Sequence, residues 1–180
     1  TEGDAVAGVQ LEDGEKIARL ALDRGVNYFD TSPDYSGSGS EQAMGRAIRG
    51  VRDQLFIATK FCTPMGHLPP GTPVAKYMAA VEGSLSRLGT DYVDLCHVHS
   101  CDAIERLMDE NVHEAFDRLK QQGKVRFLGF STHTPNLVQV GARGRTPAAA
   151  AAFPTCATTT GSLAARRKPS ANRSPTAGWA

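Results

Sequence analysis

The sequence has few cysteines and no long apolar run, and these two absences each exclude a class of protein. Four cysteines occur in 180 residues and none lies in a C-x-x-C pair, which excludes a small scaffold held together by disulfides. The longest apolar run, near Ala148–Phe153, is far shorter than the ~20 residues that a membrane-spanning helix needs. We therefore expect a cytoplasmic protein, in a reducing setting, that does not bind membranes.

Strong charge of either sign is also lacking. The formal net charge is +1, so nothing indicates a basic surface for nucleic acid or an acidic surface for a basic partner. No secretory signal segment is apparent, and because the first residue is Thr1 we expect the natural start to be missing. With 41% hydrophobic and 22% charged residues, the composition suits one globular domain.

The last 40 residues differ in composition from the rest. Residues 141–180 contain six of the 20 Lys and Arg residues and none of the 19 Asp and Glu residues. Ala, Arg, Pro, Thr, Gly and Ser fill 34 of these 40 positions, which leaves too little apolar area to offset the entropy of ordering the segment. We predict a low-complexity, basic, disordered tail. It is either a natural linker or, in the interpretation that we favour, the product of a frame break near residue 140.

Helical and strand-like segments alternate through residues 1–140. Four segments have the apolar spacing of helices: 15–24, 41–48, 73–88 and 111–122. Four apolar segments resemble strands: 26–31, 55–60, 92–99 and 125–130. Helices between apolar strands are typical of parallel βα units. No tight hairpin is indicated, and residues 4–10 are a poor candidate for an earlier strand.

Polar residues lie where the predicted strands end: Asp30, Lys60, His99 and Ser131. Ionisable groups at the carboxyl ends of successive strands are poor core residues, but they are typical of a site at the top of a barrel. A doubly wound sheet would instead spread these ends along a line. We therefore predict an α/β fold, a partial (β/α)8 TIM barrel of about four to five βα units over residues 1–140. A whole barrel needs roughly 250 residues, so about half is covered.

Four residues form a candidate catalytic set: Asp30, Tyr35, Lys60 and His99. A phenol is a weak acid at neutral pH, and the Lys60 ammonium would stabilise the Tyr35 phenolate while Asp30 holds the lysine. His99 would bind or orient a carbonyl oxygen. Such a set donates a proton to an oxygen as a hydride reaches the adjacent carbon. Each residue alone is more often structural, so the prediction rests on their joint position at strand ends.

Several ordered motifs resemble one known family, the aldo-keto reductases: GVNYFDTSPDY, SEQAMGRAI, LFIATKF, SLSRLGTDYVDLCHVH and GKVRFLGFSTH. The resemblance covers about residues 12–135. It implies a TIM barrel that binds NADP(H) without a Rossmann glycine motif. It also implies reversible reduction of aldehydes and ketones to alcohols.

The resemblance assigns roles to individual residues. Four match the family's catalytic positions: Asp30, Tyr35, Lys60 and His99. Asp30 is also expected to contact the cofactor. Ser131 matches a serine that contacts the nicotinamide carboxamide. The family often has Asn at the next position, which is Thr132 here, so that contact is either weakened or moved to His133.

A second histidine, His97, lies two residues before His99 and so faces the same side of the strand, whereas Cys96 faces the opposite side. A zinc site needs three or four converging ligands, so the run Cys96–Cys101 predicts no metal and no metal-dependent hydrolase. We expect His97 to be hydrogen-bonded inside the barrel. The alternative is a second polar group beneath the site.

Two hypotheses about function follow. The first is an NADP(H)-dependent reductase of a small-molecule carbonyl substrate, present as a truncated or frameshifted chain. The second is a non-catalytic barrel fragment or binding module that has lost cofactor binding. The sequence leaves both the carbonyl substrate and the oligomeric state open.

Overall fold

The structure, a computed structural model, describes residues 10–138 and 157–158. The predicted tail at 141–180 lies outside the described residues except for Ala157–Thr158. These two residues form the short strand β7, which pairs with strand β6, so the chain adds to the sheet at this point. The candidate strand at 4–10 also lies outside the described residues, apart from Gln10.

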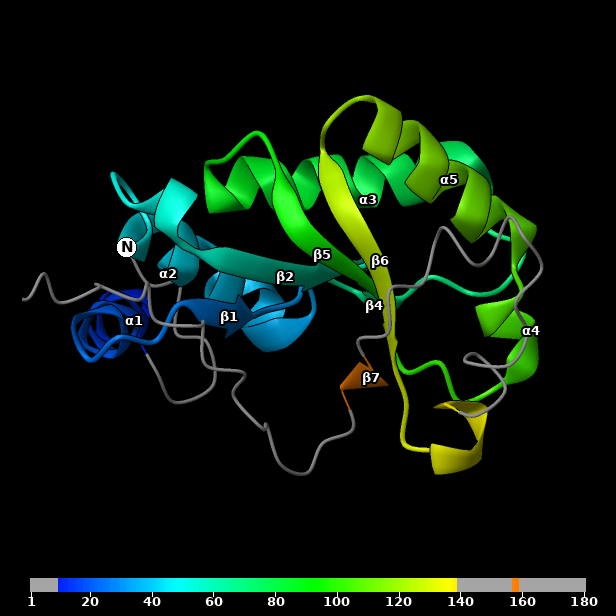
Figure 1. Cartoon of the computed structure of the whole chain (residues 1–180), viewed down its shortest axis with the longest axis horizontal. Helices are drawn as coiled ribbons and strands as arrows, with labels where there is room; N and C mark the ends of the chain where they lie inside the picture. Colours follow the sequence, from blue (N-terminus) through cyan, green and yellow to red (C-terminus); the bar gives the residue numbers. More distant parts are fainter. Residues whose placement is uncertain (1–9, 139–156, 159–180) are drawn as a thin grey trace, which may run out of the picture.

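Five strands form one parallel sheet: β1 (Tyr28–Asp30), β2 (Phe56–Lys60), β5 (Val93–Val98), β6 (Val125–Ser131) and β7 (Ala157–Thr158). Their order in the sheet, β1-β2-β5-β6-β7, is their order along the chain (Figure 1). A doubly wound sheet reverses its strand order at a switch point, and no such reversal occurs among the described strands. The sheet is therefore an arc of a (β/α)8 barrel, as the sequence predicted.

The helices lie close to their predicted positions: α1 (Leu11–Asp23), α2 (Gly39–Ala47), α3 (Val74–Leu88), α4 (Ile104–Leu107) and α5 (Glu110–Gln121). Helix α1 begins four residues before its predicted start. The sequence analysis missed this first turn because Leu11 is its one large apolar residue, so the turn shows no apolar period. Thr72 does not cap α3 as its position suggests. Its hydroxyl donates to the Pro69 carbonyl at 2.7 Å, and Pro73 occupies the N-cap position without a side-chain cap.

The hydrophobic core lies between the sheet and helices α3 and α5, which lie next to each other (Figure 1). Helix α5 buries the four side chains that its periodicity predicted: Val112, Ala115, Phe116 and Leu119. These pack in one cluster with side chains of β5 and β6, including Cys96 and Leu128. Burial of each large apolar side chain contributes about 1.5–3 kcal/mol, so this layer fixes the outer face of the arc. No helix in the described part of the chain has the length and hydropathy to cross a bilayer.

A small antiparallel hairpin follows β2, and the sequence analysis was wrong to expect none. Strands β3 (Cys62–Thr63) and β4 (Gly66–His67) pair so that Cys62 lies opposite His67. The Thr63 hydroxyl donates to the Gly66 carbonyl at 3.1 Å and accepts from the Met65 amide at 3.2 Å. Strands of two residues are too short to show an alternating pattern, and the turn lacks an Asn-Gly or Asp-Gly signal. The hairpin was therefore invisible in the sequence.

A buried carboxylate joins three strands near their amino ends. Asp94 accepts hydrogen bonds from Arg52 at 2.8 Å, from Arg126 at 2.7 Å and from the Ile57 backbone amide at 2.9 Å. Its side chain is 2% exposed. Because a buried carboxylate is stable only when its oxygens are paired, these contacts fix the register of β2, β5 and β6. The register in turn sets the positions of the side chains at the carboxyl ends.

A second buried carboxylate, Glu41, joins α2 to its neighbours. It accepts hydrogen bonds from Thr59 of β2 and from Arg87 of α3, both at 2.6 Å. Glu41 has no exposed surface. It therefore anchors α2 next to Lys60, and α2 in turn holds the short 3-10 turn Tyr35–Ser38 that precedes it.

Candidate active site

The ammonium of Lys60 is the centre of the site. It lies at the end of β2 and is 2% exposed. Its Nζ donates to both carboxylate oxygens of Asp30, at 2.9 Å each, and to the Thr31 carbonyl at 2.8 Å. These three acceptors match the three donors of an ammonium group. Parallel pairing of β1 with β2 brings Asp30 and Lys60 together although 30 residues separate them.

Tyr35 lies beside this pair. The Lys60 Nζ is 4.6 Å from the centroid of the Tyr35 ring, and Tyr35 is 39% exposed. The next two residues, Ser36 and Gly37, have positive φ angles of 55° and 56°, so the chain turns sharply after Tyr35. This turn places the tyrosine at the carboxyl ends of the strands with one side open to solvent.

His99 completes the predicted set. Its ring contacts the Tyr35 ring edge-on, with centroids 5.8 Å apart. Burial is the largest cause that lowers the pKa of His99; the Asp34 carboxylate opposes it, His67 and Lys60 add to it, and the net pKa is about 4. The imidazole is therefore neutral at neutral pH. The structure thus gathers Asp30, Tyr35, Lys60 and His99 at one end of the sheet.

His97 lies below this site and is 1% exposed. The Phe130 backbone acts on its ring as a hydrogen-bond partner, although neither ring nitrogen makes a hydrogen bond of normal geometry with the described residues. Burial lowers its pKa to about 4. Gly129 on β6 makes room for the ring, because a Cβ there would lie 3.1 Å from His97 Nδ1. A neutral imidazole therefore fills the space over Gly129.

The residues expected to face the nicotinamide lie at the end of β6. The Ser131 hydroxyl oxygen accepts from the Ser100 amide at 3.2 Å, so its own proton is free to donate. The Thr132 hydroxyl instead donates to Asp102 at 2.8 Å. The His133 amide and ring also bind Asp102, at 2.6 and 3.1 Å. Of these positions, Ser131 is the one whose hydroxyl donor is available to a ligand.

Asp102 was missed by the sequence analysis because nothing in its neighbourhood distinguishes it from a loop carboxylate. Hydrogen bonds from the His133 backbone and side chain, and from Thr132, lower the pKa of Asp102 to about 2. It holds the segment after β6 against the segment after β5. Ser131 is thereby fixed at the edge of the site.

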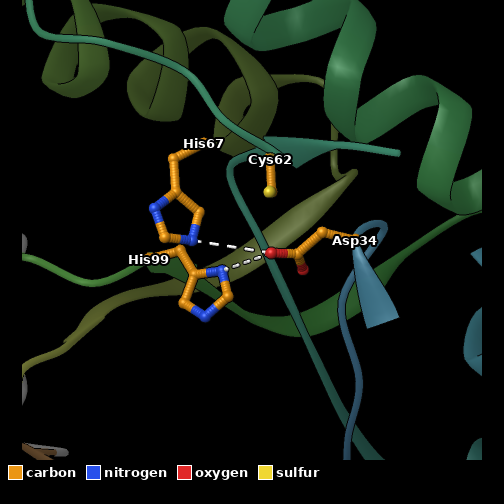
Figure 2. Close-up of side chains that lie close together, drawn as sticks. All are labelled: Asp34, Cys62, His67 and His99. Carbon is orange, nitrogen blue, oxygen red and sulfur yellow. Dashed lines mark ion pairs between the residues drawn. The ribbon is translucent and has the colours of Figure 1, made fainter. Parts of the chain in front are cut away.

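A second cluster adjoins the site, and three of its four members were also missed: Asp34, Cys62 and His67. Figure 2 shows them around His99. Burial and then the Asp34 carboxylate raise the pKa of the Cys62 thiol to about 12. Burial raises the pKa of Asp34, but the Ser32 hydroxyl and the His99 imidazole lower it by more, so the net pKa lies below its usual value. No short motif joins these residues, so only tertiary structure reveals the cluster.

An arc of parallel βα units with Asp, Tyr, Lys and His at its strand ends defines a barrel protein whose site lies at the carboxyl ends. The sequence model of the Aldo/keto reductase family matches residues 2–157. The chain therefore belongs to the aldo/keto reductase family.

Individual relatives agree with this assignment. The oxidoreductase YqkF of Bacillus subtilis is 37% identical over 136 residues, which cover 73% of this chain and 44% of that protein. L-galactose dehydrogenase of Arabidopsis thaliana is 32% identical, with 72% and 41% covered. The chain thus spans less than half the length of these relatives.

Solved structures of aldo-keto reductases match this chain over a similar share of its length. The holo form of an aldo-keto reductase from Bacillus halodurans has a TM-score of 0.63 and 33% identity, covering 77% of this chain and 47% of that one. An aldo-keto reductase from Klebsiella pneumoniae in complex with NADPH has a TM-score of 0.60 and 32% identity, with 74% and 44% covered.

Proposed function

We propose that this chain carries the proton-transfer half of an NADP(H)-dependent carbonyl reductase, which reduces an aldehyde or ketone to an alcohol. One observation carries the proposal. The buried Lys60 ammonium, paired with Asp30, lies 4.6 Å from the centroid of the Tyr35 ring. Family membership and the NADPH complex of the Klebsiella pneumoniae relative support the choice of cofactor.

In this proposal Tyr35 is the proton donor to the carbonyl oxygen. The Lys60 ammonium stabilises the phenolate that remains, and Asp30 keeps the ammonium in place. A neutral His99 donates an N–H to the same carbonyl oxygen and orients it. When bound, NADPH supplies the hydride that reaches the carbonyl carbon. The new C–H bond and the proton transferred to the oxygen together give the alcohol, and Tyr35 regains its proton from solvent.

The residues present fit a nicotinamide carboxamide in part. The free donor of Ser131 suits the amide oxygen, and Asp30 lies at the same end of the sheet. The Thr132 hydroxyl is bound to Asp102, so its proposed role is to position the strand end that carries Ser131. We also place the protein in the cytoplasm, which is supported by the cysteines within the described residues, Cys62, Cys96 and Cys101, all of them free and buried.

The test begins with cofactor binding by the chain as it exists. We expect NADPH fluorescence to change saturably on titration with the protein. No change at high micromolar protein would reject the reductase proposal. Turnover is then followed as loss of NADPH absorbance with simple aldehydes, where binding without turnover indicates a binding module.

The decisive variant is Tyr35→Phe, which removes only the phenolic hydroxyl. We expect kcat to fall by about 10²–10⁴-fold with NADPH affinity unchanged. Tyr92→Phe is the matched control, because that ring lies between Arg52 and Arg126, 4.0 and 4.3 Å from their guanidinium carbons, at the other end of the sheet. Equal activity of Tyr35→Phe and wild type would contradict the assignment of Tyr35.

A further inference from the structure

We propose that Asp34, Cys62, His67 and His99 form a binding site for one divalent transition-metal ion, with Zn²⁺ the preferred ion by ligand type. Each residue offers one ligand atom, and the four atoms all lie within 4.8 Å of one another. Figure 2 shows the side chains directed toward a common space. The expectation of no metal considered only the run Cys96–Cys101, which contributes a single ligand here.

The fold brings these ligands together from three places. The hairpin of β3 and β4 sets Cys62 directly opposite His67. His99 follows β5, and Asp34 precedes the turn that carries Tyr35. The hairpin therefore supplies two of the four ligands, and the segments that follow β1 and β5 supply the other two.

The distances already approach those of a metal site. His99 Nδ1 lies 3.4 Å and His67 Nε2 lies 3.5 Å from the same Asp34 oxygen. Tetrahedral Zn²⁺ with bonds of 2.0–2.3 Å has neighbouring ligand atoms about 3.3–3.8 Å apart. These two pairs already have that separation. The remaining ligand atoms need to move by about 1 Å or less to reach it.

One ligand atom, His99 Nδ1, makes no hydrogen bond of normal geometry with a described residue. His99 is 9% exposed, and its Nδ1 is buried. A buried polar nitrogen without a hydrogen bond carries a free-energy cost. A metal ion bound by Nδ1 removes that cost and leaves the ring proton on Nε2.

The chemistry of the ligands selects the ion. A thiolate and two imidazoles favour Zn²⁺ over Mg²⁺ or Ca²⁺, which prefer oxygen. On binding, the Cys62 thiol releases its proton to solvent and its sulfur bonds to the metal. Thiolate and carboxylate together balance the +2 charge. The Ser32 hydroxyl donates to the other Asp34 oxygen and so orients the carboxylate.

Metal binding is measured on the full chain without cofactor or substrate, so the result is independent of the proposed reductase activity. The chelator-treated protein is titrated with Zn²⁺ against a chromogenic chelator, and with Co²⁺ as a spectroscopic probe. We expect one ion per chain. The Co²⁺ form is expected to show a thiolate charge-transfer band and the intense visible bands of a tetrahedral site.

Two variants remove ligands outside the catalytic set. We expect Cys62→Ser to abolish the charge-transfer band, and His67→Ala to weaken Zn²⁺ binding at least about tenfold, as loss of even a supporting residue does. Cys101→Ser, which removes another buried thiol, and His133→Ala, which removes another exposed imidazole, are controls that retain wild-type binding. Because His67 is exposed, His67→Ala tests the site even where Cys62→Ser lowers fold stability.

Three results would overturn the proposal. One is failure of the wild-type chain to take up Zn²⁺ at micromolar concentrations. Another is equal affinity of wild type and His67→Ala. The third is an octahedral Co²⁺ spectrum without a thiolate band, which identifies an adventitious ion only.

Discussion

Lys60 and Asp30 form a pair whose members differ in exposure: the lysine side chain is 2% exposed and the aspartate 40%. The ammonium depends on the carboxylate for two of its three hydrogen bonds. The carboxylate has water as an alternative partner. Removing Asp30 therefore leaves a buried ammonium without its main partner, whereas removing Lys60 leaves a carboxylate that water can solvate.

This asymmetry predicts unequal losses of stability. Asp30→Ala leaves a buried charge without its partner, so we expect the free energy of unfolding to fall by about 1–3 kcal/mol, less than for a fully buried pair because water reaches the site. Lys60→Met replaces the buried charge by an apolar chain of similar size, so we expect a smaller loss. Urea denaturation measures both. A larger loss for Lys60→Met would contradict this account.

Asp94 is predicted to be among the most sensitive polar positions for stability. Asp94→Ala leaves the Arg52 guanidinium and the Ile57 amide without their partner, and we expect a loss of about 3–5 kcal/mol. Arg118→Gln is the control, since it removes an exposed pair with Glu114 on α5 and costs less than about 0.5 kcal/mol. Both values come from denaturant unfolding. Similar losses for the two variants would show that Asp94 does not fix the strand register.

Gly129 is predicted to accommodate a side chain poorly while His97 is present. A Cβ there would lie 3.1 Å from both His97 Nδ1 and Leu95 Cδ1, so we expect Gly129→Ala to lower stability by about 1–3 kcal/mol. In a His97→Ala background the same change is expected to cost less, because one of the two clashing groups is gone. A double-mutant cycle measures the difference. Strict additivity would show that His97 does not set the space at Gly129.

The lowered pKa of Asp102 predicts that the free energy of unfolding falls as the solution becomes acidic. Its pKa is lowered to about 2 in the folded chain, against about 3.9 for an unperturbed aspartate. As the pH falls, Asp102 therefore binds a proton in the unfolded chain before it does so in the folded chain. The stabilisation by Asp102 is fully present above the unfolded pKa and is lost as pH falls toward about 2.

The matching experiment compares wild type with Asp102→Asn by urea denaturation through this acidic range. We expect Asp102→Asn to be less stable at neutral pH and to show a shallower loss of stability as the pH falls. Parallel curves for the two proteins would mean that Asp102 is not held by His133 and Thr132.

Much of the fold was predictable because it depends on local pattern. The spacing of Val112, Phe116 and Leu119 marks one helix face, and short apolar runs that end in a polar residue mark strand ends. Parallel pairing then places those ends along one edge of the sheet, which is why Asp30, Lys60 and His99 were predicted to meet. Family resemblance supplied their roles.

Tertiary structure alone decided what depends on pairing between distant segments. A hairpin with two-residue strands has no periodicity, so the position of Cys62 opposite His67 was not predictable. Asp34 and Asp94 look alike in the sequence, but one lies between two imidazoles and the other between two guanidinium groups. A side chain's neighbours are set by strand register and chain crossings rather than by its own sequence neighbourhood. The sequence therefore determined which chemical groups reach the strand ends, and the three-dimensional packing decided which of them face each other.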